Sequence, residues 1–247
     1  MGTPTATLVV VGNEVLSAKV RDENGPFAAE HLRDLGVRLQ AILTLPDDLP
    51  LVAEAVARER VRADWLLTSG GVGPTHDDLT LPAVARALGR PLVRHAGLVE
   101  YIRRSHRRWW GTEAPEASLR MADVPEGTRL LGETDLPILA VENVVMLPGV
   151  PSFFRKQLVL FARDLRAEPF HLAEVFVTAG EDRLAPILDR LAAEHAAVEI
   201  GSYPRFDGAD HRVKITIEAK DRPRVEAARA ALLAALPDGT LVRVVGP

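Results

Sequence analysis

The feature that most restricts the fold is a regular alternation of apolar runs with helical patterns near the start of the chain. Apolar runs of strand length cover residues 7–11, 37–45 and 64–68, and helical patterns cover residues 28–35 and 51–60 between them. This βαβαβ order predicts a parallel sheet with helices on both faces. Ligands of such sheets bind beyond the carboxyl ends of the strands. The residues that directly follow each strand are therefore the first candidates for a functional site.

A glycine-rich loop follows the third apolar run. Residues 70–80 read Gly-Gly-Val-Gly-Pro-Thr-His-Asp-Asp-Leu-Thr, and a helical pattern over residues 81–88 comes next. Glycines let a ligand approach the backbone closely, and the helix start offers free N–H groups and a positive dipole end to a phosphate. Asp77 and Asp78 suit a divalent cation bound to the same phosphates. The loop predicts a phosphorylated, nucleotide-like ligand.

Each acidic or basic residue of this loop also has an ordinary structural interpretation. One of Asp77 and Asp78 can serve as the N-cap or first-turn acid of the following helix. His76 can act as a ligand or a base, or it can be a polar surface residue. The sequence does not decide which of the two aspartates is catalytic.

Two further loops follow strands of the expected sheet. Glu14 comes directly after the first strand, either as part of the ligand pocket or as a turn acid. Asn24 could line the same pocket, or it could cap a helix together with Asp22. Strands over residues 138–141 and 144–147 lead into Leu-Pro-Gly-Val-Pro-Ser, residues 147–152, before a helix over residues 153–166. This junction can present N–H groups as the glycine loop does.

Glu168-Pro169 marks a domain boundary, so we expect domains over residues 1–168 and 169–247. The second domain reads as strands over residues 172–178, 197–202, 213–219 and 240–245, with helices over 183–195 and 223–236. The βαββαβ order is the split-βαβ pattern of ferredoxin-like folds. Ser202 and Tyr203 stand at the end of a strand, in a turn from which they could reach the pocket of the first domain.

Composition narrows the class of protein. The formal net charge of −4 argues against a general nucleic-acid coat or a binder of acidic membranes. The basic, aromatic run at residues 103–110 is better interpreted as a solvated helix face than as a stacking surface for nucleic acid. The absence of cysteine excludes disulfides, thiolate metal sites and cysteine nucleophiles. With no signal-peptide pattern and no membrane-spanning apolar stretch, we expect a cytoplasmic protein.

Five segments resemble a known family. Thr68–Thr80 resembles the signature loop of the molybdopterin-binding domain, and more narrowly the branch found in the competence/damage-inducible protein A (CinA) family and at the N-terminus of eukaryotic FAD synthase. Residues 12–17, with Asp22 and Asn24, resemble the first motif of that branch, and residues 147–151 its third. Residues 201–204 and 213–217 resemble its small domain. The likeness covers nearly the whole chain.

The resemblance implies a MogA/MoaB-like three-layer α/β domain followed by a small α+β domain of KH-like or ferredoxin-like form. It implies hydrolysis of a nucleotide pyrophosphate such as ADP-ribose or FAD, assisted by Mg²⁺, Mn²⁺ or Co²⁺. Asp77 and Asp78 would be catalytic and would bind the metal together with Glu14. The expected ligand-binding residues are Gly70, Gly71, Gly73, Pro74, Thr75, Glu14, Asn24, Gly149, Pro151, Ser202 and Tyr203.

Other functions and two departures from the family pattern stay open. The pocket could hold molybdopterin and a nucleotide in molybdenum cofactor biosynthesis, or it could be a nucleotide-binding module without turnover. Ala18 stands where the first motif usually has glycine, and Glu23 replaces its usual threonine. The resemblance also implies a homo-oligomer, dimer or trimer, without the deamidase domain of longer members. Because the small domain has no Gly-x-x-Gly loop, we expect no RNA binding.

Overall fold

The computed structural model describes residues 2–132, 137–206 and 210–247. The chain divides into two compact units, Met1–Ala167 and Glu168–Pro247, one residue from the expected boundary. Among the described residues, no helix combines the length and the apolar composition that crossing a bilayer requires.

The first unit is built on a six-stranded sheet in the order β2-β1-β3-β8-β7-β6. The strands are β1 (Thr5–Val11), β2 (Arg38–Leu45), β3 (Trp65–Ser69), β6 (Arg129–Leu131), β7 (Ile138–Val141) and β8 (Val144–Leu147). The first four in spatial order are parallel, as expected, whereas β7 and β6 are antiparallel to their neighbours. The reason is local: only Glu142 and Asn143 separate β7 from β8, and so short a connection forces an antiparallel hairpin.

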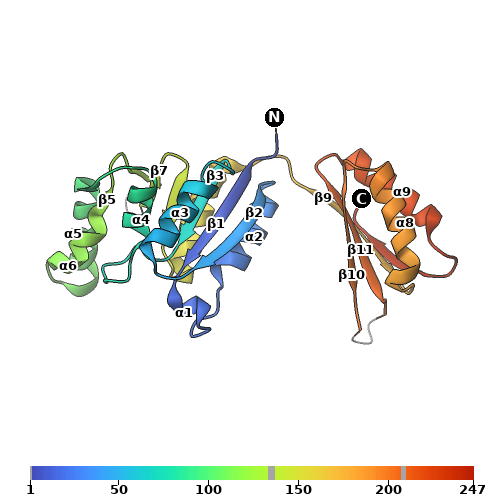
Figure 1. The fold of residues 1–247 in the computed structure, drawn as a ribbon, viewed down its shortest axis with the longest axis horizontal. Helices are drawn as coiled ribbons and strands as arrows, with labels where there is room; N and C mark the ends of the chain where they lie inside the picture. The colour runs from blue at the N-terminus through green and yellow to red at the C-terminus, as the bar shows by residue number, and fades with distance from the viewer. Residues whose placement is uncertain (1, 133–136, 207–209) are drawn as a thin grey trace. The chain divides into compact units, whose positions relative to one another are not determined.

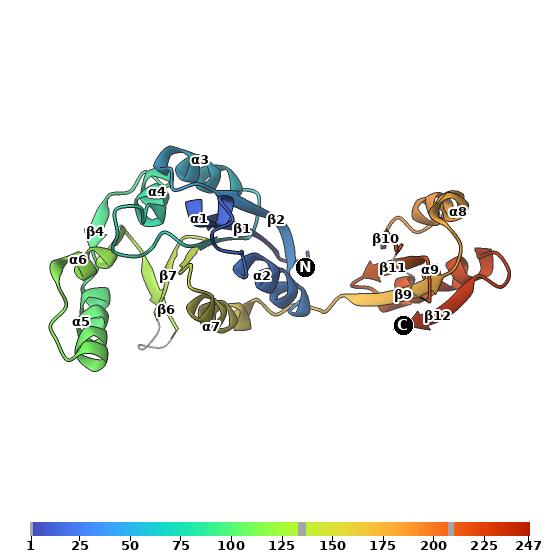
Figure 2. The same ribbon diagram turned by 90° about the horizontal axis from the view of Figure 1, so that it is seen from below.

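Helices cover both faces of this sheet, so the expected three-layer α/β fold is confirmed (Figures 1 and 2). Side chains alternate along β1: Leu8 and Val10 join the core with α2 (Asn24–Asp34) and α7 (Pro151–Ala162). Val9 and Val11 join the core on the opposite face, with α3 (Leu49–Glu59) and α4 (Thr80–Ala87). Burial on both faces explains why β1 is a continuous apolar run.

The helix boundaries differ from expectation at α2. The helix starts at Asn24, four residues before the expected Ala28, because the Asp22 carboxylate accepts hydrogen bonds from the N–H groups of Asn24 and Gly25 at 2.9 and 3.0 Å. Pro26 is tolerated there, since the first turn of a helix needs no intrahelical donor. The remaining elements of this unit are the long helix α5 (Ala96–Trp110) and several short elements. The short ones are α1 (Asn13–Leu16), β4 (Leu92–Arg94), α6 (Glu116–Leu119), η1 (Arg120–Ala122), β5 (Asp123–Pro125) and η2 (Arg163–Leu165).

The second unit has a four-stranded antiparallel sheet in the order β10-β11-β9-β12. Its elements are β9 (His171–Val177), α8 (Glu181–Glu194), β10 (Glu199–Pro204), β11 (Val213–Ala219), α9 (Arg222–Ala235) and β12 (Leu241–Val245). One face of the sheet packs on α8 and α9 through a core that includes Val175, Ile215 and Leu232 (Figure 1). This is the ferredoxin-like arrangement that the βαββαβ order predicts.

Candidate functional site

Three loops meet where β1, β3 and β8 end. Gly70 follows β3 with a φ of +98°, and a Cβ atom there would lie 2.3 Å from the carbonyl oxygen of Val11. A Cβ atom on Gly149 would lie 3.2 Å from the Cα of Gly70. Both the backbone angle and the available space exclude a side chain at Gly70. The glycines thus allow the three strand ends to touch, at the edge of the sheet where ligands are expected.

Asn24 links these loops from the start of α2. Its side chain is buried, and Nδ2 donates to Ser69 Oγ and to the carbonyl oxygen of Gly149, both at 2.8 Å. In the described part of the chain its Oδ1 atom has no hydrogen-bond partner. Asn24 was expected to contact substrate, and its two bonds show that it also fixes the ends of β3 and β8 relative to each other.

Asp78 and Thr80 close the glycine loop. The Asp78 carboxylate accepts hydrogen bonds from the N–H groups of Gly73 and Thr75 at 2.7 and 2.8 Å, and from the Thr75 hydroxyl at 2.5 Å. Thr80 Oγ1 donates to the carbonyl oxygen of Gly70 at 2.7 Å, and its N–H donates to Gly71 at 2.9 Å. Backbone donors aimed at a carboxylate form strong, charge-assisted bonds. Asp78 therefore holds the loop in shape from inside.

These bonds correct the expectation that the helix start offers several free N–H groups. The first N–H of α4, on Thr80, already serves Gly71, and Pro82 has none. The N–H groups of Gly73 and Thr75 point to Asp78. Those of Gly71 and Val72 take no part in these bonds and are among the loop's remaining donors. A phosphate that used Gly73 and Thr75 would first have to displace the Asp78 carboxylate.

Asp77 is placed differently from its neighbour. Its side chain is 57% exposed, and the adjacent His76 side chain is 98% exposed, with 3.9 Å between His76 Nδ1 and Asp77 Oδ1. Hydrogen bonding to Thr75 and to its own backbone N–H lowers the pKa of Asp77. The Thr75 hydroxyl also donates to Asp78 at 2.5 Å, so the two aspartates share this donor. Asp77 is thus an ionised, solvent-facing carboxylate on a fixed loop.

The three predicted metal ligands do not gather into one cluster. In residues 2–132, 137–206 and 210–247, no group of three or more His, Asp or Glu side chains is arranged to hold a metal ion. The Glu14 carboxylate folds back over Gly12, where a Cβ atom would lie 2.4 Å from Glu14 Oε1. The donor set still fits a magnesium-like cation, since such ions commonly use one or two carboxylates and complete their shell with water and substrate phosphates.

Arg120 is a site residue that sequence reasoning missed. Its guanidinium donates to the carbonyl oxygen of Pro74 at 2.9 Å, which brings an exposed positive charge to the glycine loop. Arg120 opens the short 3₁₀ turn η1 after α6, 46 positions from Pro74, and nothing in the local pattern points to the contact. The predicted residue Pro151 is the first residue of α7, a favourable position for proline.

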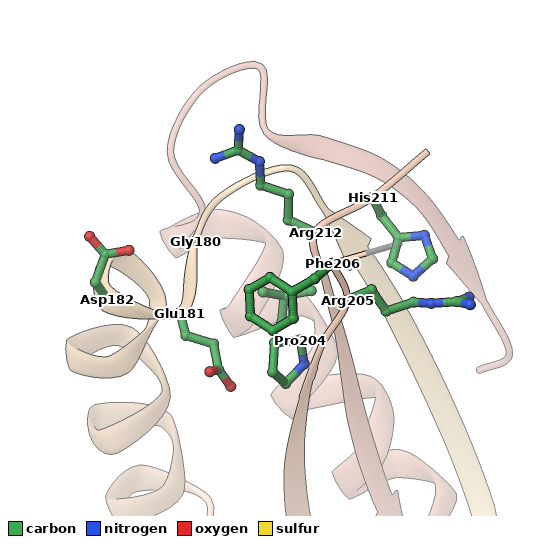
Figure 3. A pocket seen from close by; sticks show the side chains of 9 residues that line it. Gly180, Glu181, Asp182, Pro204, Arg205, Phe206, His211 and Arg212 are labelled. Atoms are coloured by element: carbon green, nitrogen blue, oxygen red, sulfur yellow. The ribbon is translucent and has the colours of Figure 1, made fainter. Parts of the chain in front are cut away.

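Ser202 and Tyr203 lie in β10 of the second unit, so their expected reach to the glycine loop stays a prediction. Ser202 Oγ donates to Glu181 Oε1 at 2.8 Å, and the Lys214 ammonium lies 5.3 Å from the centre of the Tyr203 ring. A cavity of about 610 Å³ opens beside this strand end, between Glu181, Arg205 and Phe206 (Figure 3). None of the predicted site residues lines it.

Comparison with known proteins supports both units. Residues 7–167 match the family model described as a probable molybdopterin binding domain, and residues 169–245 match the middle domain of FAD synthase. A protein of Archaeoglobus fulgidus is 30% identical over 90% of this chain and 93% of its own. A probable FAD synthase of Caenorhabditis briggsae is 31% identical over 92% of this chain.

The solved structure of CinA from Thermoplasma acidophilum, a protein with unknown function, has a TM-score of 0.58 and 28% identity to this chain. The match covers 66% of this chain and 98% of that one. The chain spans about half the length of the C. briggsae relative, 49% of it.

Proposed function

The chain belongs to the family of probable molybdopterin-binding domains, and from that premise we propose that it hydrolyses a nucleotide pyrophosphate of the ADP-ribose or FAD type with a divalent metal ion. The observation that carries this proposal is the division of work between two adjacent acids. The Asp78 carboxylate accepts the hydrogen bonds that hold the glycine loop. Asp77 is the exposed carboxylate, and it lies in the loop that follows Gly70, where the backbone has no room for a side chain.

The chain's own groups supply the binding and orientation that the reaction needs. Gly71 and Val72 offer N–H donors to a phosphate, and Arg120 adds positive charge at the edge of the loop. Asp77 holds the attacking water or its metal ion at the phosphorus. A divalent ion, when bound, lowers the pKa of that water and neutralises the developing phosphoryl charge. Glu14, at the neighbouring strand end, orients water on the same side.

A second candidate function has its own support. The family model is described as molybdopterin-binding, and the relative with 31% identity is a probable FAD synthase. A pterin phosphate or a nucleotide carries the same phosphate chemistry, so both fit the loop. We keep pterin binding in molybdenum cofactor biosynthesis, and a nucleotide-binding module without turnover, as the competing proposals.

One panel separates the three. Purified protein is incubated with ADP-ribose, FAD or NAD and with Mg²⁺, Mn²⁺ or Co²⁺, and AMP is measured by chromatography. We expect AMP from at least one substrate, and its loss with a chelator and in Asp77→Ala. If wild type and Asp77→Ala release no AMP under any condition, the hydrolase proposal is wrong. Tight molybdopterin binding then supports the second function, and nucleotide binding alone supports the third.

Two further properties belong to the same proposal. The family likeness leads us to expect a homo-oligomer, and the signal-peptide and hydropathy patterns lead us to expect a cytoplasmic location. Light scattering of the purified chain tests the first, where a monomer mass at all concentrations would contradict it. Fractionation of the source cells tests the second.

A further inference from the structure

A groove between α2 and α7 combines positive charge with an apolar floor. It has a volume of about 440 Å³ and is lined by His31, Leu35, Val159, Arg163 and Arg166. His31 lies four residues before Leu35, the C-cap of α2, and Val159 lies four residues before Arg163, the C-cap of α7, so each pair shares one face at a helix end. The groove is thus the seam where the two helices pack over the sheet.

Two arginines line this groove. Arg163 opens the short 3₁₀ turn η2, and Arg166 follows the turn as its C-cap residue, so both belong to the segment that leaves α7. In the described part of the chain neither guanidinium has a carboxylate partner, although the chain as a whole is acidic. Two guanidinium groups in one cavity provide hydrogen-bond donors that suit a phosphate or carboxylate.

His31 adds a polar group to the wall of the groove. Its ring stacks on Phe27 with 5.6 Å between the ring centres, which fixes its position. Nε2 is buried without a hydrogen-bond partner among the described residues. Burial lowers the pKa of His31, and the nearby Asp34 carboxylate acts in the opposite direction. The positive charge of the groove therefore comes from the arginines.

The groove is separate from the glycine loop. Asn24 stands at the start of α2 beside the loop, and His31 lies seven residues further on, about 10 Å along the helix axis. Because α2 runs back from the carboxyl ends of the strands, the groove lies toward their amino ends. A molecule in the groove would leave the candidate active site open.

We propose that the α2–α7 groove is a second binding site, for a small anion with an apolar body. The anionic group, phosphate or carboxylate, lies between Arg163 and Arg166, and the apolar body rests on Leu35 and Val159.

Histidine ring signals in ¹H–¹³C NMR spectra test this directly. The chain has seven histidines, and His31→Gln and His76→Gln assign the two that matter. His31 reports on the groove, and the exposed His76 reports on the glycine loop, so the two sites are read separately. The probes are inorganic phosphate, AMP and hexanoate, without metal ions and at constant ionic strength. We expect a saturable shift of the His31 signal with AMP or hexanoate, at lower concentration than with phosphate.

Charge variants complete the test. Arg163→Gln/Arg166→Gln should weaken binding at least about tenfold, as expected when charge-assisted hydrogen bonds are lost. Arg103→Gln/Arg104→Gln on α5 removes the same charge elsewhere and should leave the titration unchanged. Should the first variant fold poorly, Arg163→Lys/Arg166→Lys keeps the charge without the planar fork and should bind more weakly than wild type.

The proposal is overturned if the His31 signal does not move, if it moves linearly with every salt, or if both arginine pairs respond alike. A shift of His76 alone would support the glycine loop as the anion site and reject the groove. Failure of the hydrolase assay leaves this result unaffected, because no turnover is measured.

Discussion

The loops after β3 and after β1 end at the same edge of the sheet but are held in different ways. The glycine loop is tied internally by Asp78 and Thr80, and it uses positive φ angles only at glycines, Gly70 and Gly71. The loop after β1 is tied at its near end by Gly12 and Asn13 and at its far end by Asp22 and Asn24, and its middle contains Ala18 at a φ of +56°. The loop after β3, one wall of the site, is therefore fixed by its own hydrogen bonds. The loop after β1, the other wall, contains a strained backbone angle at Ala18.

The largest effect should come from a side chain at the centre of the fixed wall. Gly70→Ala forces an unfavourable backbone angle and places Cβ against the Val11 carbonyl, so we expect about 3 kcal/mol of destabilisation. Gly89→Ala is the matched control: its φ is +63°, with open space around it, and the backbone angle alone should cost about 1 kcal/mol. Urea denaturation measures both. Equal losses would mean that the contact of strand ends does not matter.

A smaller loss is expected at the link between the two walls. Asn24→Ala leaves Ser69 Oγ and the Gly149 carbonyl without their buried donor, which should cost about 2 kcal/mol. Asn13→Ala, in the same segment but exposed, should change the free energy of unfolding by less than about 0.5 kcal/mol. If the two variants unfold at the same urea concentration, Asn24 does not connect the loops.

The smallest effect has the opposite sign. Ala18 has the left-handed conformation that glycine adopts freely, so Ala18→Gly should stabilise the protein by up to about 1 kcal/mol. Ala57→Gly, on an exposed position inside α3, should instead destabilise by about 1 kcal/mol. A loss of stability in both variants would show that Ala18 is not strained in solution.

Much of the first unit follows from apolar periodicity. Continuous apolar runs identified β1 and β3, because strands buried on both faces have no polar alternation, whereas the edge strand β2 is only partly buried. The alternation of strands with helical patterns predicted their parallel order. The antiparallel edge depends on a two-residue turn at Glu142 and Asn143, which periodicity does not describe. The early start of α2 rests on N–H bonds accepted by Asp22, and capping at this position was one of the two interpretations that the sequence left open.

The site was less accessible to sequence reasoning than the fold. The glycine loop and its acids stand out as a pattern, but Asp77 and Asp78 are identical neighbours, and only the path of the loop separates their roles. Arg120 contacts Pro74 from the short 3₁₀ turn η1, which is too short to show a hydrophobic periodicity in the sequence. Ser202 and Tyr203 belong to the second unit, and their expected role in ligand binding stays a prediction.

The central claim, that Asp77 acts on the ligand while Asp78 holds the loop, is tested most directly by measuring activity and stability together in Asp77→Asn and Asp78→Asn. We predict that Asp77→Asn lowers metal-dependent AMP release by about 100-fold or more at an unchanged urea midpoint. Asp78→Asn should lower the free energy of unfolding by about 2 kcal/mol. Full activity in Asp77→Asn, with activity lost at unchanged stability in Asp78→Asn, would contradict the claim.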